Sequence, residues 1–499
     1  MHKYLLRSTL HIGVHWVAGS KHASARSAKG KDEIDKALGI IRSNDVRWVD
    51  LQFVNVPGEL LSASVPEWQL DRDSMRNGFP RLDGSSVRGF TEIFESDMML
   101  VPIPNTTVRV PWSPGTARIL SEVHWGGGRG RLERDPRYVA EQAEEHQRSL
   151  GFSSRFGPEP EFFIFDAVRI GKKGVKFESR EAVDGGSGGL VIEAKGGYRK
   201  VEPMDQQRHI CKEIGNVLSD AFGVRMEGVD HEVASHGQVE INIRFDGLVK
   251  TADNIIDLKY AARNVAHAHN KVALFLPKPI PDDNGSGMHT HVSIWSADGK
   301  PLMYDENSDY AELSQTGRYV VGGILRHALA LSAIVSPTVN SYRRLVPGFE
   351  APVNVTWSAS NRSAIIRIPT NSDGKGIAHA KRLEYRAPDP LCNPYLAFSA
   401  MLMAGLDGIK HSMDPGQPVR NENIYHMSAK KKRELGIREL PGSLSDALDS
   451  LESDSEFLKP VFSNSMLSSY VELKRNEVRD LTPLQKSVGP KELLRYMNI

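Results

Sequence analysis

Residues 157–165 read GPEPEFFIF and residues 284–294 read NGSGMHTHVSI. Both segments alternate polar and apolar side chains in the manner of a β-strand, because successive strand side chains point to opposite faces of a sheet. This alternation places five polar side chains on one face of their strands: Glu159, Glu161, His289, His291 and Ser293. The two segments therefore predict a sheet that gathers acids and imidazoles on one side.

Two further segments show the same alternation. GQVEINIRF (237–245) is predicted to put its apolar face on Val239, Ile241, Ile243 and Phe245, and Glu240 on the other face. KRLEYRAP (381–388) puts Arg382, Glu384 and Arg386 on one face. Between the strands, HEVASHGQ (231–238) carries Glu232.

Each segment taken alone has a plainer explanation, because alternating strands usually turn their polar face to water. The set as a whole favours a metal site. Two carboxylates on one face repel each other unless a cation or water lies between them. Oxygen and imidazole donors suit two hard divalent ions such as Mg²⁺ or Mn²⁺. The candidate donors are Glu159, Glu161, Glu232, Glu240, His289 and Glu384.

Five arginines occur close to these strands, within about 45 residues of sequence: Arg344, Arg362, Arg367, Arg382 and Arg386. The planar guanidinium binds phosphate and carboxylate through paired hydrogen bonds. Arginines beside two metals favour a polyanionic substrate such as a nucleoside triphosphate, although any single arginine could instead belong to an ion-paired surface. The phosphate loops of the common nucleotide-binding families are absent from the sequence.

The composition excludes several classes of protein. The 499 residues carry 63 basic and 62 acidic side chains, so no overall basic field exists to attract nucleic acid. No uninterrupted apolar run approaches the length of a membrane span, and a cytoplasmic enzyme is expected. Cys211 and Cys392 alone cannot form a disulfide framework, so any metal must be held by oxygen and nitrogen donors.

The chain is expected to divide into three parts. Residues 1–31 lack acidic residues and contain several Lys, Arg and Ser, which is typical of a disordered tail, a wrongly assigned start or an organelle transit peptide. In the last case the enzyme would lie in an organelle matrix. Residues 32–130 form a small α+β domain that begins with a helix over residues 33–42. Residues 131–499 form a larger domain with a helix after Asp135-Pro136.

These motifs together resemble the glutamine synthetase family, in its type I bacterial and archaeal form. The resemblance covers residues 32–499. It is carried by LDGSSVRGF (82–90), GPEPEFF (157–163), KGGY (195–198), HEVASHGQVEI (231–241), NGSGMHTHVS (284–293), RRLVPGFEAPV (343–353), NRSAIIRIP (361–369) and RLEYRAP (382–388). NIYHMS (423–428), around Tyr425, is similar to the branch of the family that is not adenylylated.

The resemblance implies a role for each motif residue. Glu161, Glu232 and Glu240 would bind the first metal, and Glu159, His289 and Glu384 the second. Glutamate would be held by Asn284, Gly285, Arg344 and Arg386, and ATP by Phe245, His291, Ser293, Arg367 and Arg382. The remaining roles fall to Arg362 on the transferring phosphoryl group, Glu350 on a flap that closes the site, and Asp83 and Ser86 at an ammonium site supplied by a neighbouring subunit.

The implied fold is α+β: a small N-terminal β-grasp domain, then a large catalytic domain with a curved antiparallel sheet. The implied reaction joins ammonia to L-glutamate, consumes ATP and passes through γ-glutamyl phosphate. Two or more Mg²⁺ or Mn²⁺ ions would serve as cofactors, and the partners would be other copies of the chain in two stacked hexameric rings. A γ-glutamylpolyamine ligase, or a ligase for another amine, is the alternative within this fold.

Overall fold

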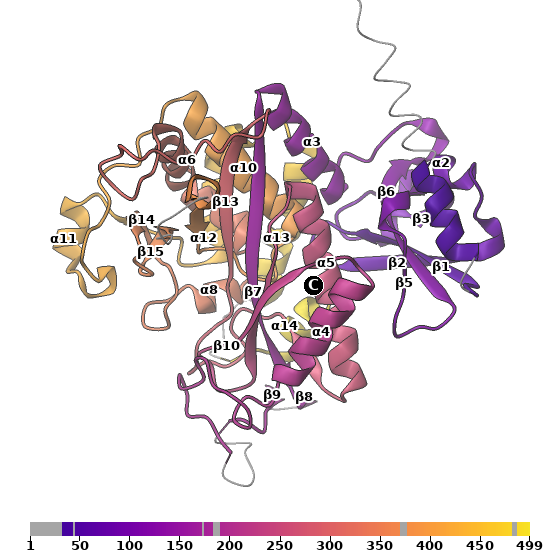
Figure 1. Ribbon diagram of the computed structural model, residues 1–499, viewed down its shortest axis with the longest axis horizontal. Coiled ribbons are helices and arrows are strands. Elements are labelled where there is room, and N and C mark those ends of the chain that lie inside the picture. Colours follow the sequence, from indigo (N-terminus) through magenta and orange to yellow (C-terminus); the bar gives the residue numbers. More distant parts are fainter. Residues whose placement is uncertain (1–31, 43–44, 172–173, 183–189, 370–376, 482–486) are drawn as a thin grey trace, which may run out of the picture.

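The computed structural model describes residues 32–42, 45–171, 174–182, 190–369, 377–481 and 487–499 (Figure 1). The expected tail, residues 1–31, lies outside this part of the chain. The N-terminal domain begins with a helix over residues 32–42, which buries Ile34, Ala37, Leu38 and Ile41 as the helical spacing predicts.

A six-stranded sheet follows this helix, in the order β2-β1-β6-β4-β3 with β5 also on β6. β1 and β2 form a hairpin with β2 at the edge of the sheet, and on its other side β1 pairs with β6 in parallel. A parallel pair needs a crossover connection, and the remaining strands supply it. The elements are β1 (Trp48–Val54), β2 (Leu60–Pro66), α2 (Ser74–Asn77), β3 (Phe79–Asp83), β4 (Asp97–Pro102), β5 (Val108–Arg109) and β6 (Thr116–Trp125).

The second domain is built on a curled nine-stranded sheet in the order β10-β11-β7-β13-β16-β15-β14-β17, with β12 also on β7. The expected antiparallel arrangement is found at every pair except β14 and β15, which run parallel. The strands are β7 (Phe152–Phe165), β10 (Met226–His231), β11 (Gln238–Ile243), β12 (Val272–Leu274), β13 (Met288–Ser296), β14 (Asn354–Ala359), β15 (Ala364–Ile368), β16 (Leu383–Tyr385) and β17 (Arg438–Glu439). A separate hairpin joins β8 (Ala167–Gly171) to β9 (Gly174–Glu178).

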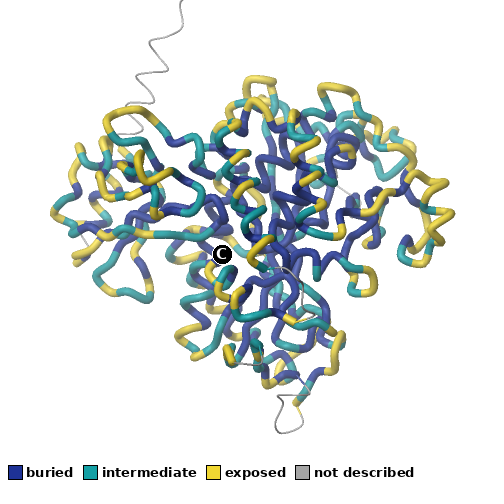
Figure 2. The backbone as a smooth tube through the Cα atoms, turned by 180° about the vertical axis from the view of Figure 1, so that it is seen from behind, coloured by how far each residue is buried: buried dark blue, intermediate teal, exposed yellow. Residues whose placement is uncertain are grey.

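Helices pack around this sheet and bury it, as the dark segments of Figure 2 show. The predicted helix after Asp135 is present, and the Asp135 side chain accepts a hydrogen bond from Arg137 N. The helices are α3 (Pro136–Ser149), α4 (Arg208–Asp220), α5 (Leu248–Ala268), α6 (Gln315–Arg326), α7 (Ala328–Val335), α8 (Ser341–Arg344), α9 (Ile377–Ala380), α10 (Pro394–Lys410), α11 (Ala429–Glu434), α12 (Leu444–Ser453), α13 (Asn464–Leu481) and α14 (Pro490–Tyr496).

Glycines allow α6 and α10 to pack with their backbones in contact. A β-carbon on Gly323 would lie 2.1 Å from the carbonyl oxygen of Ala404, and one on Gly408 would lie 2.1 Å from that of Tyr319. Neither position has room for a larger residue, because the obstructing atoms belong to backbone rather than to a side chain that can move. Of the helices in the described ranges, none is alone long and apolar enough to cross a membrane; α6 and α7 meet that test only as a bent pair.

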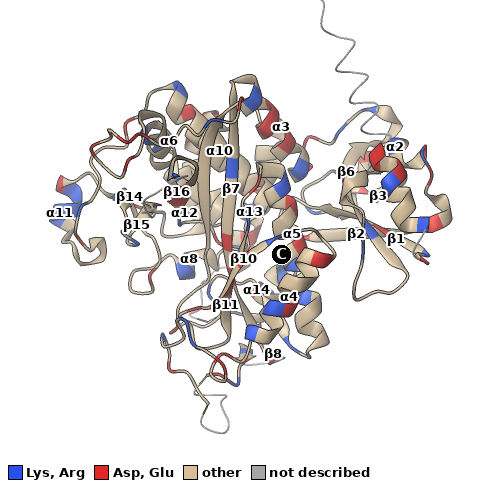
Figure 3. Cartoon of the chain, viewed as in Figure 1, with Lys and Arg blue, Asp and Glu red and all other residues tan. Residues whose placement is uncertain are grey.

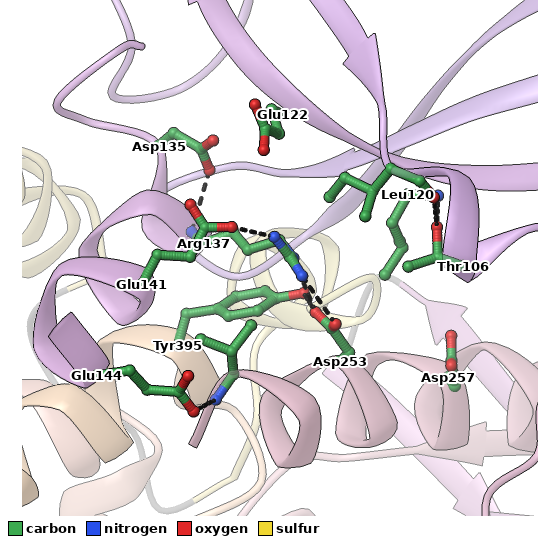
Figure 4. Close-up of polar contacts among 12 residues, drawn as sticks. Thr106, Leu120, Glu122, Asp135, Arg137, Glu141, Glu144, Asp253, Asp257 and Tyr395 are labelled. Atoms are coloured by element: carbon green, nitrogen blue, oxygen red, sulfur yellow. Dashed lines mark hydrogen bonds and ion pairs between the residues drawn. The ribbon is translucent and has the colours of Figure 1, made fainter. Parts of the chain in front are cut away.

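Two buried acids on α5 are paired with arginines: Asp257 with an arginine of the N-terminal domain, and Asp253 with an arginine of its own domain. We call these contacts the domain joint. Arg118 on β6 pairs with Asp257, and both side chains are buried. One turn earlier, Asp253 accepts two hydrogen bonds of 3.1 Å from Arg137 on α3 and one of 2.7 Å from the Tyr395 hydroxyl (Figure 4). Figure 3 shows basic and acidic residues close together on α3 and α5. The domain joint thus balances each of its acids with a cation.

Candidate active site

Strand register brings the predicted polar side chains together on one face of the large sheet. Glu240 lies opposite Glu161 across β11 and β7, and Glu159 lies opposite His289 across β7 and β13. Glu384 then lies opposite both His291 on β13 and Arg367 on β15. Because directly opposed residues share a face, four segments far apart in sequence supply one continuous row of acids and imidazoles.

All six candidate metal donors line a single cavity of about 180 Å³, which we call the acid cavity. The ligand atoms of Glu159, His289 and Glu384 lie within 4.8 Å of one another, as do those of Glu161, Glu240 and His289. Glu232 follows β10 and faces the same cavity, although the second of these close groups contains His289 in its place. The structure therefore offers two adjoining three-residue groups that share one imidazole.

The pKa values of several carboxylates in the acid cavity differ strongly from their ordinary values. Burial raises the pKa of Glu161, Glu232 and Glu240 well above the ordinary value, and the negative charges of neighbouring carboxylates raise each one further. Glu384 behaves in the opposite way: burial would raise its pKa, but Arg386, His291 and Arg367 together hold it below the usual range. On one side of the cavity, burial and neighbouring carboxylates outweigh the nearby arginines, and on the other side an acid is paired with arginines.

This donor set fits divalent cations. Carboxylate oxygens with one imidazole are the ligands that Mg²⁺ and Mn²⁺ take. Burial and the nearby arginines lower the pKa of His289 well below its usual value, so its ring stays neutral and keeps a lone pair for a metal. The carboxylates of Glu161, Glu232 and Glu240 repel one another, which adds to burial in raising the pKa values of Glu161 and Glu232. A bound cation would reduce this repulsion.

Basic and amide side chains close the rest of the acid cavity. Arg344 and Arg386 are buried, and Arg344 is fixed by bonds of 2.8 Å and 3.1 Å to the carbonyl oxygens of Ala387 and Arg386. The Asn284 side-chain oxygen is buried and finds no hydrogen-bond partner among the residues that the structure describes, so it is available to a ligand. The remaining predicted residues that line the cavity are Gly285, Glu350, Arg362 and Arg367.

A second cavity, of about 310 Å³, adjoins the first and shares Glu159 and Asn242 with it. Its lining includes four residues predicted to contact a nucleotide: Phe245, His291, Ser293 and Arg382. Within it, Arg382 Nε lies 3.1 Å from His291 Nδ1, and His291 Nε2 lies 2.9 Å from Glu159 Oε1. An elongated ligand could therefore occupy both cavities, with its anionic part toward the acids and arginines.

Alternation alone was wrong about Phe245. It predicted this side chain on the apolar face with Val239 and Ile241, but β11 ends at Ile243 and the chain turns. Phe245 is 47% exposed and lines the second cavity instead. Phe245 leaves the apolar face because the strand is shorter than its pattern; its contact with a nucleotide, which the family resemblance implies, stays a prediction.

Several lining residues were not singled out from the sequence. Gln238 donates hydrogen bonds to Glu161 Oε2 at 3.2 Å and to the Gly285 carbonyl oxygen at 3.0 Å, so it connects a candidate metal donor to the NGSG turn. Trp295 lines the second cavity beside His379, with ring centroids 5.3 Å apart. The signal for Trp295 was present, because it continues the alternation of His289, His291 and Ser293.

Asp83 and Ser86 are the exception among the predicted residues, because neither lines the acid cavity or the second cavity of its own chain. They lie in the N-terminal domain, which sits at one side of the molecule while β14 and β15 lie at the other (Figure 1). Asp83 accepts hydrogen bonds from Ser85 N at 2.9 Å and from the Ser86 hydroxyl at 2.8 Å. Both serine side chains lower the pKa of Asp83, which is therefore ionised at neutral pH.

A small grasp-like domain, followed by a sheet that sets carboxylates and arginines beside a second cavity, is the arrangement of a metal- and nucleotide-dependent ligase. The chain belongs to the glutamine synthetase family. The family models described as "Glutamine synthetase, beta-Grasp domain" and "Glutamine synthetase, catalytic domain" match residues 45–126 and 133–496. The family is ATP-dependent and uses divalent metal ions, and this chain is a ligase of the glutamine synthetase type.

Known relatives extend over nearly the whole chain. A glutamine synthetase of Sulfolobus acidocaldarius is 55% identical over 469 residues, which are 93% of this chain and 98% of the relative. A 3-hydroxylaminophenol mutase of Cupriavidus pinatubonensis is 43% identical over 93% of this chain and 98% of its own length. A solved GmaS/ADP complex is 27% identical with a TM-score of 0.76, and the match covers 93% of this chain and 99% of that one.

Proposed function

We propose that this protein joins ammonia to the γ-carboxylate of L-glutamate, at the expense of ATP, through γ-glutamyl phosphate. The observation that carries the proposal is the pair of adjoining cavities: one is crowded with acids and arginines, and the other is lined by Phe245, Trp295 and Arg382. A carboxylate is a poor electrophile, so it must be phosphorylated before an amine can displace its oxygen. The acid cavity can take the carboxylate that accepts the phosphoryl group, and the second cavity can take the nucleotide that donates it.

The residues of the acid cavity have different roles according to their charge. Arg344, Arg386 and Asn284 bind and orient glutamate from one side. Divalent ions held by the six donors would supply positive charge against the phosphate oxygens. Arg362 meets the charge that develops on the transferring phosphoryl group, and Arg367 binds the other phosphates of ATP; preorganised cations of this kind act without rearrangement during the reaction. Glu350 lies where it can shield the acyl phosphate from water.

Ammonia is the favoured amine. Asp83, ionised and flanked by Ser85 and Ser86, suits a small cation that carries several N–H donors. The relative from Sulfolobus acidocaldarius, the more similar in sequence, is a glutamine synthetase, whereas the GmaS structure is 27% identical. A ligase for a polyamine or another amine is the alternative, because relatives in this fold carry other names and the cavity beside Glu350 is open, at about 1030 Å³.

The test is an amine panel with purified protein, ATP, glutamate and Mg²⁺. Phosphate release and the mass of the amide product would be measured with ammonium, methylamine and putrescine. We expect kcat/KM to be largest for ammonium, with glutamine as the product. A larger kcat/KM for methylamine or putrescine would support the alternative, and no amide from any amine would refute the proposed function.

The site is proposed to be completed by a second copy of the chain, in a dodecamer of two hexameric rings. Asp83 and Ser86 lie outside the acid cavity of their own chain, and Ile93 and Phe94, in the same domain, are 83% and 85% exposed. Large apolar side chains exposed together favour a protein contact. The test mixes Asp83→Ala and Arg362→Ala after dissociation: reassembled mixtures should regain activity that neither parent has. Mixtures as inactive as the parents, where the wild type recovers, would contradict a shared site.

A further inference from the structure

The segment over residues 346–353, which we call the flap, carries Glu350 to the acid cavity. Two of its residues have a left-handed backbone: Gly348 with φ of +96° and Glu350 with φ of +58°. Glycine adopts such a conformation freely, but a residue with a β-carbon does so at a cost in free energy. A strained conformation persists only when neighbouring groups hold it, so the contacts of the flap decide where Glu350 lies.

Two lysines hold the first half of the flap through Phe349. The ammonium groups of Lys195 and Lys278 lie 4.2 Å and 3.5 Å from the centre of the Phe349 ring. At these distances a cation is attracted by the negative face of an aromatic ring. Lys195 Nζ also donates a hydrogen bond of 3.2 Å to the Gly348 carbonyl oxygen. Phe349 thus connects the flap to two segments that are distant in sequence.

The lysines are themselves anchored beside the acid cavity. The buried carboxylate of Asp283 accepts hydrogen bonds of 2.9 Å from Lys195 N and 2.7 Å from Ser235 N. Lys278 Nζ donates to the Asp283 carbonyl oxygen. Because Asn284 follows directly, the loop that presents Asn284 to the cavity also fixes the two cations that hold Phe349. The KGGY segment (195–198) therefore has a use beyond lining the site.

A tyrosine holds the second half of the flap. Tyr425, in the short helix η6 (Ile424–His426), donates a hydrogen bond of 2.8 Å from its hydroxyl to the carbonyl oxygen of Ala351, next to Glu350. Its backbone is fixed in turn, because Tyr425 N donates to the Asn423 side chain at 3.0 Å. Tyr425 and Glu350 also line the same open cavity together with Arg362. The flap is thus held on both sides of Glu350 by groups outside it.

We propose that Lys195, Lys278 and Tyr425 are positioning residues that keep the flap closed over the activated acyl group and so limit its loss to water. The inference rests on the proposed function, because only a reactive acyl phosphate requires such protection. Water attack on the acyl phosphate breaks its C–O bond, releases phosphate and returns glutamate. A loosened flap would therefore spend ATP without forming an amide.

Tyr425→Phe removes one hydroxyl and is the principal variant; Lys278→Met removes a charge and keeps most of the volume. The matched control is Tyr470→Phe, because the Tyr470 hydroxyl donates a bond of 2.7 Å to the Ala333 carbonyl oxygen in the helical layer, away from the flap. Two quantities are measured on the full protein: phosphate released per amide formed, and deuterium uptake of residues 346–353 without substrates.

We expect Tyr425→Phe to raise the ratio of phosphate to amide at least threefold and to increase deuterium uptake of the flap, with Tyr470→Phe like the wild type in both. A ratio and an uptake unchanged in Tyr425→Phe would overturn the inference, even if Lys278→Met fails to fold. A wild type that forms no amide from any amine would refute the proposed function instead. Uptake would still show whether Tyr425 holds the flap.

Discussion

The acid cavity and the domain joint both bury charged side chains, but they balance those charges in opposite ways. In the domain joint, Asp253 and Asp257 each face an arginine, and Tyr395 adds a further donor to Asp253. In the acid cavity, Glu240 and Glu161 face each other across two paired strands, and the nearest charges raise their pKa values rather than lower them. The domain joint pairs each acid with an arginine of the same chain, whereas the acid cavity leaves carboxylate charge to be met by something it binds.

The difference separates residues kept for stability from residues kept for binding. An ion pair buried with its partner contributes little net stability but is costly to break, because the remaining charge stays buried alone. Like charges crowded at a site cost stability and are retained where activity needs them. Substitutions in the two clusters should therefore have opposite signatures: loss of activity without unfolding in one, and unfolding as the primary effect in the other.

The largest effect is expected at Glu161. Glu161→Gln keeps the shape of the side chain but removes a charged donor from the acid cavity. We expect kcat/KM to fall by at least about 10³-fold, which is about 4 kcal/mol in the transition state. The unfolding midpoint should fall little, because Gly287 N and Gln238 still have an oxygen acceptor at that position. The rate of phosphate release at saturating Mg²⁺ measures kcat/KM, and urea unfolding measures the midpoint. Wild-type activity in this variant would contradict the assignment of Glu161 as a metal donor.

In the domain joint, a substitution should affect the free energy of unfolding more than it affects activity. Asp257→Asn leaves Arg118 buried without a carboxylate, which should lower the free energy of unfolding by about 3 kcal/mol. Activity of the folded protein should change far less. The control is the double variant Arg118→Met with Asp257→Leu, which replaces both charges and should recover most of the loss. Urea unfolding at one fixed protein concentration compares the variants, since assembly also affects the midpoint; an Asp257→Asn midpoint equal to the wild type would show that the pair contributes nothing.

The acid cavity and the domain joint also differ in how much of each could be predicted from the sequence. That these acids share strand faces could be predicted, because alternation fixes which side chains point to the same side, and the family resemblance implies that they act together. Strand length and long-range pairing were not predictable in the same way: Phe245 lies past the end of β11, and Gln238 acts through a turn more than 40 residues distant. The pairs of the domain joint bridge up to 139 residues, and nothing local in the sequence marks Arg118 as the partner of Asp257.

A buried cation that has an aromatic contact but no hydrogen bond in the described part of the chain tests the same idea on the helix that carries both acids of the domain joint. Lys259 on α5 is buried, and its Nζ has no hydrogen-bond partner within the described ranges; burial lowers its pKa to about 8. Lys259→Met should raise the free energy of unfolding at pH 7 by on the order of 2 kcal/mol.

The pH dependence gives a second readout for Lys259. Between pH 8 and the ordinary lysine pKa of 10.5, the unfolded chain binds more protons than the folded one, so the wild type should gain stability as pH rises through that window. The variant should lack this gain. A flat wild-type profile over the same window, or a variant less stable than the wild type at pH 7, would show that the ammonium group has a favourable contact.

The smallest effect is the sharpest test, because it compares two acids of one cavity. Burial and the charges of Glu159 and Glu232 raise the pKa of Glu240, whereas Arg386 and Arg367 pair with Glu384. In EDTA, Glu240→Gln should stabilise the protein by about 1 kcal/mol, since it removes repulsion, and Glu384→Gln should destabilise it, since it leaves two arginines without an acid. Both variants should gain less than the wild type from added Mg²⁺, because each lacks a donor. Thermal unfolding in EDTA and in Mg²⁺ measures all four values. If both substitutions shift the unfolding midpoint in EDTA in the same direction, the charges of Glu240 and Glu384 are not balanced in different ways. The contrast between crowded acids and paired acids would then hold between the two regions but not within the acid cavity.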